Sequence, residues 1–310
     1  MVRKPPTWAF EVGVREAYAS CARDARRHYE NFPVASLLLP RRMRRHVAAV
    51  YAFARAADDF ADEGDRPAPE RLELLDGWKR RLHDAVESRQ PGPAPRPGEP
   101  ANAQDIFVAV GETIRSLSLP VRLFEDLLSA FRQDVTVSRY RTWDQMMDYC
   151  RRSANPVGRL VLRIAGYDRM SLDDSSDALC AALQLTNFWQ DLKIDFDRGR
   201  LYLPTEERER HGALEGDLAA GRITPEWRRA LGTAAARTRL LFDEGRPVCD
   251  GVDGRLRYEL RATWLGGVRV LNRLERSGFD VVNHRPSLGP RDALWIAPLV
   301  LAWRPGVPLP

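Results

Sequence analysis

Residues 41–64 read RRMRRHVAAVYAFARAADDFADEG, and this stretch decides the fold class. Its apolar residues recur at intervals of three or four, which predicts an α-helix that ends before Gly64. Four residues spaced by 4, 3 and 4 positions share one face of that helix: Tyr51, Arg55, Asp58 and Asp62. With Asp59 and Glu63, the last turn is crowded with acids that repel one another and the negative end of the helix dipole. We interpret this crowding as a site for a bound cation.

A second stretch of the same character covers residues 184–200, QLTNFWQDLKIDFDRGR. One stripe of the expected helix carries only oxygen ligands, at spacings of 3, 4 and 4: Gln184, Asn187, Asp191 and Asp195. Oxygen ligands without histidine or thiolate favour Mg²⁺, which binds through one or two carboxylates and substrate phosphates. Either cluster alone is compatible with a solvated acidic face, but two of them favour metal binding. We therefore expect two facing helices to hold roughly two or three Mg²⁺ ions against one diphosphate.

The rest of the chain continues the helical periodicity, so we expect an all-α fold that forms a single domain over residues 1–310. Alternation typical of strands is weak throughout, and the sequence contains no glycine-rich nucleotide-binding loop and no internal repeat. The expected helices cover residues 11–28, 41–63, 70–88, 104–116, 120–134, 142–165, 173–196, 225–246, 252–276 and 289–303.

Two segments depart from this pattern. Residues 89–102 hold five prolines and two glycines, which exclude helix and sheet. We interpret them as a surface loop inside one helical domain, with a linker between domains as the alternative. Residues 293–303, ALWIAPLVLAW, form an apolar tail that is too short to span a bilayer. This tail is either a last helix docked on the core or an interfacial membrane contact, for which Trp295 and Trp303 would suit the headgroup zone.

Composition limits the remaining choices. The chain has 310 residues, 44% hydrophobic, with a net charge of +5, and only three of its 48 basic residues are lysine. So many arginines reflect either codon bias or contact with phosphates or an anionic membrane. No basic run with interleaved aromatics indicates nucleic acid, and no apolar run is long enough for a transmembrane helix. Four scattered cysteines and an amino terminus without an apolar signal segment predict a cytoplasmic protein.

A third segment, residues 148–160, reads DYCRRSANPVGRL and places Asn155-Pro156 inside a helical pattern. A proline at that position predicts a kink, which either serves packing or faces a cavity. The acid motif Asp58-Asp59-Phe60-Ala61-Asp62, the segment Tyr149–Gly158, the second acid motif and Arg198–Pro204 follow in this order. Together they resemble the squalene/phytoene synthase family, the head-to-head class of isoprenyl diphosphate synthases, over about residues 28–276.

The resemblance implies a helical bundle around a central cavity and roles for particular residues. It implies that Mg²⁺ is held by Asp58, Asp59, Asp62, Asn187, Asp191 and Asp195. The residues expected to be catalytic are Asp58, Asp62, Tyr149, Asn187 and Asp191, and those expected to bind substrate are Tyr51, Arg55, Asn155, Gln184 and Arg200. The aromatic residues available to line a chain tunnel are Tyr51, Phe53, Phe188 and Trp189, with core packing as the alternative for each.

Within the family, residues 30–36, 149–158 and 187–191 are most similar to the bacterial hopanoid-pathway branch. That branch converts presqualene diphosphate and water into hydroxysqualene and diphosphate, without NADPH. Asn31, Pro33, Asn155 and Gln190 depart from the condensing members, where small hydroxyl residues, glycine and arginine are usual. The alternatives are head-to-head condensation of two isoprenoid diphosphates and a subunit that has lost turnover, against which the two acid motifs argue. We expect peripheral association with the inner membrane face, and the oligomeric state stays open.

Overall fold

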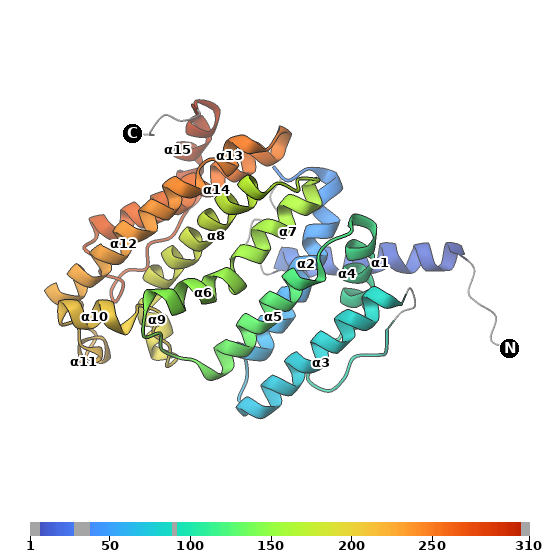
Figure 1. Ribbon diagram of the computed structural model, residues 1–310, viewed down its shortest axis with the longest axis horizontal. Helices are drawn as coiled ribbons and strands as arrows, with labels where there is room; N and C mark the ends of the chain where they lie inside the picture. The colour runs from blue at the N-terminus through green and yellow to red at the C-terminus, as the bar shows by residue number, and fades with distance from the viewer. Residues whose placement is uncertain (1–6, 28–37, 89–91, 305–310) are drawn as a thin grey trace. The chain divides into compact units, whose positions relative to one another are not determined.

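The computed structural model describes residues 7–27, 38–88 and 92–304. These residues form α-helices joined by loops, and their one element of β-type pairing is an isolated parallel bridge between Arg139 and Leu201. The prediction of an all-α fold is therefore confirmed. The chain divides into two compact units, whose helices are labelled in Figure 1. Within the described residues, the first unit holds α1–α5 and Leu160–Tyr167, and the second holds Val137–Arg159 and the chain from Asp168 onward.

The first unit is built around α2, which packs against the four other helices of the unit. Phe53 of α2 is fully buried, and its ring meets those of Trp78, Phe107 and Phe124 at centroid distances of 5.5 to 6.1 Å. This aromatic core turns the opposite edge of α2, which carries Arg55, toward the surface. The helices are α1 (Thr7–Arg27), α2 (Arg41–Asp62), α3 (Ala68–Glu87), α4 (Ala103–Leu117) and α5 (Val121–Thr136).

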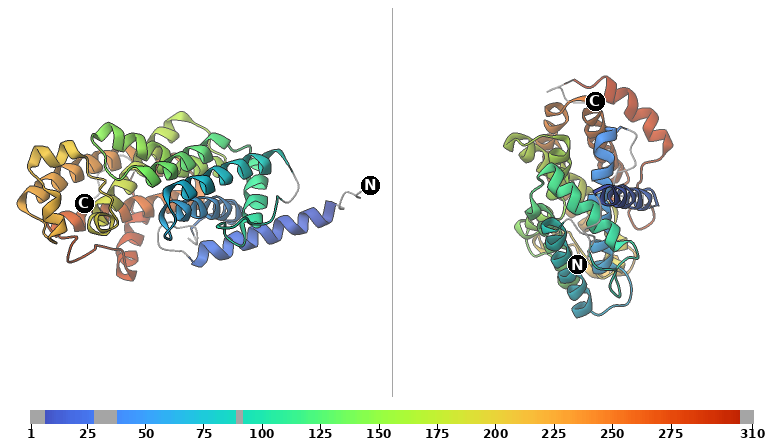
Figure 2. Two further views of the ribbon diagram at one scale, coloured as in Figure 1. Left: turned by 90° about the horizontal axis from the view of Figure 1, so that it is seen from below. Right: turned by 90° about the vertical axis from the view of Figure 1, so that its right-hand side faces the viewer.

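In the second unit, α8 packs against α12 and α14, and the three helices lie side by side in Figures 1 and 2. A Cβ on Gly245 of α12 would lie 2.5 Å from the backbone nitrogen of Leu179, so this close crossing requires glycine. The helices are α6 (Trp143–Ser153), α7 (Asn155–Ala165, which begins in this unit), α8 (Met170–Gln190), α9 (Leu192–Asp197), α10 (Thr205–His211), α11 (Glu215–Ala219), α12 (Pro225–Gly245), α13 (Val248–Gly251), α14 (Gly254–Arg276) and α15 (Pro290–Leu301).

The expected breaks and the observed ones agree in part. α6 ends at Ser153 and α7 begins at Asn155, which confirms the predicted kink. The prediction of one continuous helix over 173–196 is wrong, because Asp191 leaves helical geometry and separates α8 from α9. Three short helices, α10, α11 and α13, were not predicted, since four to seven residues are too few to show a helical period.

The proline-rich segment is non-helical over its described part, residues 92–102, and joins α3 to α4 within the first unit. These residues therefore form a loop inside the first unit and do not link the two units. An ion pair between Arg81 and Glu99, whose side chains are each 2% exposed, holds the loop against α3. Arg81 also donates a hydrogen bond to the carbonyl of Pro93.

All four cysteines are free, and three of them are buried. Burial raises the pKa of Cys21, Cys150, Cys180 and Cys249 to about 12 in each case, so none is a reactive thiolate near neutral pH. A search of the described helices finds none that is both long enough and apolar enough to cross a membrane.

Candidate active site

The acidic end of α2 is organised around Arg55. Its Nη2 lies 2.7 Å from Oδ1 of Asp59 and 2.9 Å from Oε1 of Glu63, while its Nη1 lies 3.7 Å from Oδ2 of Asp58. No basic residue stands in the last turn of α2, and Gly64 follows with a φ of +77°. One guanidinium therefore offsets a group of carboxylates that the helix dipole disfavours.

Burial and the neighbouring charges shift the pKa values of Tyr51 and Arg55. Burial raises the pKa of Tyr51, with Arg55 opposing the rise and Asp59 adding to it. Burial alone would lower the pKa of Arg55, but the carboxylates of Asp59, Asp58 and Glu63 outweigh it and raise that pKa. Arg55 therefore stays a fixed cation at this end of α2.

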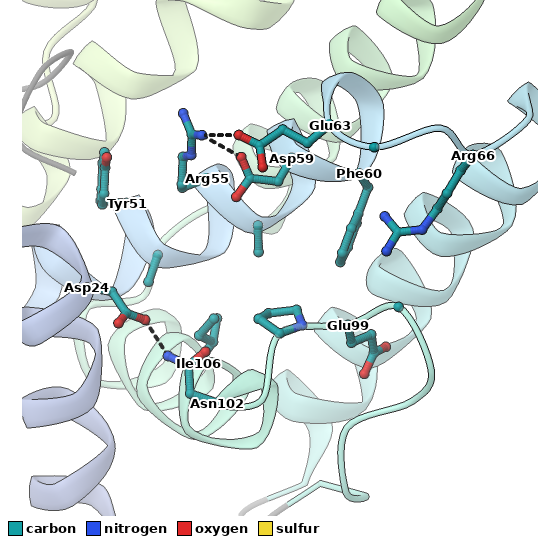
Figure 3. Close-up of a pocket in the computed structure, with 15 residues that line it drawn as sticks. Asp24, Tyr51, Arg55, Asp59, Phe60, Glu63, Arg66, Glu99, Asn102 and Ile106 are labelled. Atoms are coloured by element: carbon teal, nitrogen blue, oxygen red, sulfur yellow. Dashed lines mark hydrogen bonds and ion pairs between the residues drawn. The ribbon is translucent and has the colours of Figure 1, made fainter. Parts of the chain in front are cut away.

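A pocket of about 500 Å³ opens beside this cluster (Figure 3). Tyr51, Arg55, Asp59 and Glu63 follow one another along its α2 wall, and Asp24, Asn102 and Ile106 lie across from them. The predicted face of Tyr51, Arg55, Asp58 and Asp62 is thus only partly the pocket face, since Asp59 lines the pocket and Asp58 and Asp62 do not. Arg55 and Asp59 are four positions apart and lie on nearly the same side of α2, whereas Asp58 lies about 100° away from Asp59 around the helix axis.

The second acid cluster continues through the break at Asp191. The backbone nitrogen of Asp191 donates to the carbonyl of Asn187, and that of Asp195 donates to the carbonyl of Asp191, each at 2.8 Å. The stripe from Gln184 to Asp195 therefore keeps its helical spacing despite the break. Gln184, Asn187, Asp191 and Asp195 are each partly exposed, whereas Leu185, Phe188 and Leu192 on the other face are buried. Gly199 has a φ of +83° and ends this region, as predicted.

A loop after α14 covers part of this cluster, which no local pattern in the chain predicts. Arg285 donates to both carboxylate oxygens of Asp191, one of them from Nη2 at 3.1 Å. The side-chain amide of Gln190 donates to the carbonyl of Pro286. Residue 190, directly before Asp191, is a glutamine. The arginine that contacts Asp191 is instead Arg285, which comes from a distant part of the chain.

Tyr149 belongs to a group of four aromatic rings in the second unit. Phe188 and Tyr202 stack in parallel at a centroid distance of 3.8 Å, and Tyr149 lies 6.2 Å from Phe188 and 6.1 Å from Tyr202. Tyr140 completes the group at 5.5 Å from Tyr149. Phe53 and Trp189, by contrast, are fully buried, and Trp189 donates through Nε1 to Oγ1 of Thr238 at 2.9 Å, so core packing describes these two.

The kink between α6 and α7 combines close packing with an unsatisfied polar atom. A Cβ on Gly158 would lie 2.3 Å from Oγ of Ser176, so α7 can approach α8 only with glycine there. Asn155 is 9% exposed, and its Oδ1 has no hydrogen-bond partner among the described residues. A buried acceptor without a partner is costly in a folded protein, and it marks Asn155 as a group that can bind a ligand or water.

The two helix ends offer carboxylate and amide oxygens, which is the donor chemistry that Mg²⁺ prefers. Across the described part of the chain, no three His, Cys, Asp or Glu side chains are arranged as a ready metal cage. Arg55 and Arg285 hold carboxylates at the two ends instead. Mg²⁺ often binds through only one or two carboxylates and completes its shell with water and phosphate, so a ready cage is not required for it.

The structure therefore groups Tyr51, Arg55, Asp58 and Asp59 in the first unit, and Tyr149 with Phe188 in the second. Arg200 donates its backbone nitrogen to the carbonyl of Asp195 at 2.8 Å, which fixes the chain beside the second acid motif. The motif at residues 30–36, with Asn31 and Pro33, lies outside the described residues. Arg285 and the pocket residues Asp24 and Asn102 were missed, because no local pattern connects them to the motifs. Tyr202 lies within the quoted segment Arg198–Pro204, but its stacking on Phe188 was not predicted.

Known proteins are similar to this chain over most of its length. A family model described as squalene/phytoene synthase matches residues 25–292. A Sinorhizobium fredii protein named hydroxysqualene synthase is 34% identical over 273 residues, which cover 87% of both chains. A Zymomonas mobilis protein of the same name is 36% identical over 266 residues, 84% of this chain and 82% of that one. The crystal structure of a squalene synthase from Alicyclobacillus acidocaldarius has a TM-score of 0.76 and 38% identity, and covers 86% of this chain and 96% of its own.

An all-α fold that carries aspartate motifs at the ends of two helices, with these similarities, defines the class of protein as an isoprenoid synthase. Within that class, the chain belongs to the squalene/phytoene synthase family.

Proposed function

We propose that this protein converts presqualene diphosphate and water into hydroxysqualene and diphosphate. The observation that carries the proposal is the 34–36% identity, over most of both chains, to relatives named hydroxysqualene synthase. Both aspartate motifs and the aromatic group around Tyr149 are present in the chain, so the groups for such a reaction are available. The resemblance of the motifs supports the same reaction.

The cofactor in this proposal is Mg²⁺. The residues that would hold it are Asp58, Asp59, Asp62, Asn187, Asp191 and Asp195. When bound, the metal neutralises the diphosphate and eases ionisation of the bond between carbon and the leaving oxygen. NADPH is not part of the proposal, because water and not hydride completes the product.

Other residues of the chain have separate roles in the proposal. Arg55 moves from Asp59 and Glu63 to the diphosphate oxygens, and Gln184 and Arg200 also bind substrate. The faces of Tyr149, Phe188 and Tyr202 stabilise the carbocation left after ionisation, since π faces attract cations. Oδ1 of Asn155 accepts a hydrogen bond from the water that forms the new carbon–oxygen bond. The proton which that water loses passes to the departing diphosphate, so charge and atoms balance.

A second candidate is the head-to-head condensation of two farnesyl diphosphates to presqualene diphosphate, squalene or a phytoene-type product. The observation that favours it is the 38% identity to a crystal structure described as that of a squalene synthase. The two candidates differ in their substrate and in whether the product contains oxygen from water.

The test supplies Mg²⁺ without NADPH to the purified protein, with farnesyl diphosphate in one reaction and presqualene diphosphate in the other. Mass spectrometry in ¹⁸O-labelled water reads the products. A labelled alcohol that forms only from presqualene diphosphate supports the proposal. Consumption of farnesyl diphosphate would establish condensation instead, and a folded protein that consumes neither substrate would favour a subunit without turnover.

We further propose that the two units act as one synthase domain, since the family match over residues 25–292 includes parts of both. A cytoplasmic protein in peripheral contact with the inner membrane face fits this function, because substrate and product are lipids and the net charge is +5. The partner of the protein is thus an isoprenoid diphosphate and not a nucleic acid. Sedimentation of the purified protein at several concentrations would give its oligomeric state.

A further inference from the structure

The last described helix, α15, carries only apolar residues from Ala293 to Leu301, but it is covered on one side only. Val300 and Trp303 face inward and are each 6% exposed. Leu294 and Leu301, seven positions apart and so on one helix face, are 79% and 76% exposed. Ala297 and Pro298, between them on that face, are exposed too. A helix that is apolar all round is normally enclosed, so the open face of α15 calls for a cover.

Contacts at both ends of α15 fix the side that it turns toward the rest of the second unit. At the start of α15, Asp292 is 3% exposed, pairs with Arg269 and Arg273, and accepts a hydrogen bond from the backbone nitrogen of Gly289 at 2.7 Å. At the other end, Trp303 donates through Nε1 to Asp250 at 3.0 Å and meets the ring of Trp264 edge-on at 5.4 Å. The helix packs along α14 (Figures 1 and 2).

The exposed charges of the segment that carries the open face are basic. Between residues 281 and 304 the only acid is Asp292, which is buried and paired, whereas Arg291 and Arg304 have exposed side chains. Trp295 is 37% exposed at the edge of the face, and the guanidinium of Arg269 lies 4.3 Å from the centre of a Trp295 ring. Exposed leucines with a tryptophan at their edge and arginines around them match the interface of an anionic bilayer.

We propose that the open face of α15 docks on the surface of an anionic lipid bilayer, with Leu294 and Leu301 inserted and the helix lying in the membrane plane. Its 12 residues extend about 18 Å, which is too short to cross a hydrocarbon core of roughly 30 Å. A second copy of this chain would bring arginine against arginine, so the charges favour lipid. The inference rests on the proposed function, because lipid substrate and product give the enzyme a reason to dock there.

The test mixes the full chain with vesicles of phosphatidylcholine alone, or with added phosphatidylglycerol, and separates bound protein by flotation. The wild type is expected to float with the anionic vesicles and to dissociate as salt increases. The double variant Leu294→Glu/Leu301→Glu is expected to lose roughly tenfold or more in partitioning, since each change replaces a leucine that inserts into the bilayer by a charged side chain. Leu240→Glu on α12, at a residue that is 62% exposed, is the matched control and should bind like the wild type.

Equal flotation of the wild type and the double variant, or no flotation of the wild type, would overturn the proposal. A wild-type dimer that the double variant dissociates, without flotation, would instead identify a second copy as the cover. Turnover of detergent-dispersed presqualene diphosphate separates this inference from the proposed function. The double variant should turn over presqualene diphosphate at the wild-type rate in that assay. A wild type that floats with anionic vesicles but shows no turnover would contradict the proposed reaction and leave the docking proposal standing.

Discussion

Arg285 binds the carboxylate of Asp191 from a loop that lies 94 residues further along the chain. The carboxylate side chain is 16% exposed and the guanidinium 42%, so the pair is shielded on the aspartate side only. The same oxygens are the proposed ligands of Mg²⁺. A guanidinium that occupies them must be displaced, or must share the site with the diphosphate, before the metal binds.

Replacement of Arg285 by alanine should therefore lower the Mg²⁺ concentration needed for half-maximal turnover by roughly a few-fold, since a competing cation is removed. Steady-state rates over a Mg²⁺ titration measure this. Arg285→Lys keeps the charge and should stay near the wild-type value. A rise in the Mg²⁺ requirement of the alanine variant would mean that Arg285 helps to hold the metal–diphosphate pair.

Asp62 should oppose stability while it supports activity. It is exposed at the end of α2, at the negative pole of the helix, where no basic residue stands in the last turn. Asp62→Asn should raise the free energy of unfolding by about 0.3–1 kcal/mol and lower turnover by roughly a hundredfold. Denaturant titration and the Mg²⁺-dependent assay read the two effects. Glu73→Gln on α3 is the control, and a variant with full activity would remove Asp62 from the metal ligands.

The helices that carry the motifs could be predicted because their periods are long and their ends are marked. α2 ends within one residue of its predicted end, and Gly64 and Gly199 follow their acid clusters in left-handed conformations. The break at Asp191 could not be predicted, because residues 184–196 keep a helical pattern throughout. The role of Arg285 could not be predicted either, since only the folded loop brings it to Asp191.

Asp292 should make the anchoring of α15 depend on pH. Burial opposes its charge, but the Gly289 nitrogen, Arg269 and Arg273 outweigh burial and lower its pKa from 3.8 to about 2. A lowered folded-state pKa adds stability that is complete above pH 3.8 and is lost as pH falls through about 2. Asp292→Asn should therefore destabilise the protein by about 2 kcal/mol at neutral pH. Unfolding curves at neutral and acid pH check this, and an equal loss at both would contradict the linkage.

His46 should make the stability of the first unit depend on pH in a range above the one where Asp292 titrates. Burial, followed by the charge of Arg45, lowers its pKa from 6.5 to about 4, and its Nδ1 lies 3.0 Å from Oγ1 of Thr113. Because the folded state binds its proton more weakly than the unfolded state, stability is lost as pH falls from 6.5 toward 4, by up to about 3 kcal/mol. Thermal melts across this range measure the loss. His46→Gln should flatten the pH dependence, and an unchanged slope would place its origin elsewhere.

The pocket beside Arg55 shows a different limit of sequence reasoning. The spacing predicts one face of α2 for Tyr51, Arg55, Asp58 and Asp62, and of these four Tyr51 and Arg55 line the pocket. Whether Asp58 or Asp59 lines the pocket depends on α1 and on the loop after α3, which supply Asp24 and Asn102 on its far side. A helical wheel defines the faces of one helix, but it does not tell which face meets which neighbour.

The chemistry of the four native cysteines gives the protein a practical property. Since burial raises the pKa of each thiol to about 12, maleimide reagents at neutral pH should leave the native protein unmodified. A cysteine introduced by Leu294→Cys, at a position that is 79% exposed, would then be the one site that accepts a fluorophore. The natural sequence thus serves as its own background for fluorescence and spin-label spectroscopy, with no native cysteine to remove first.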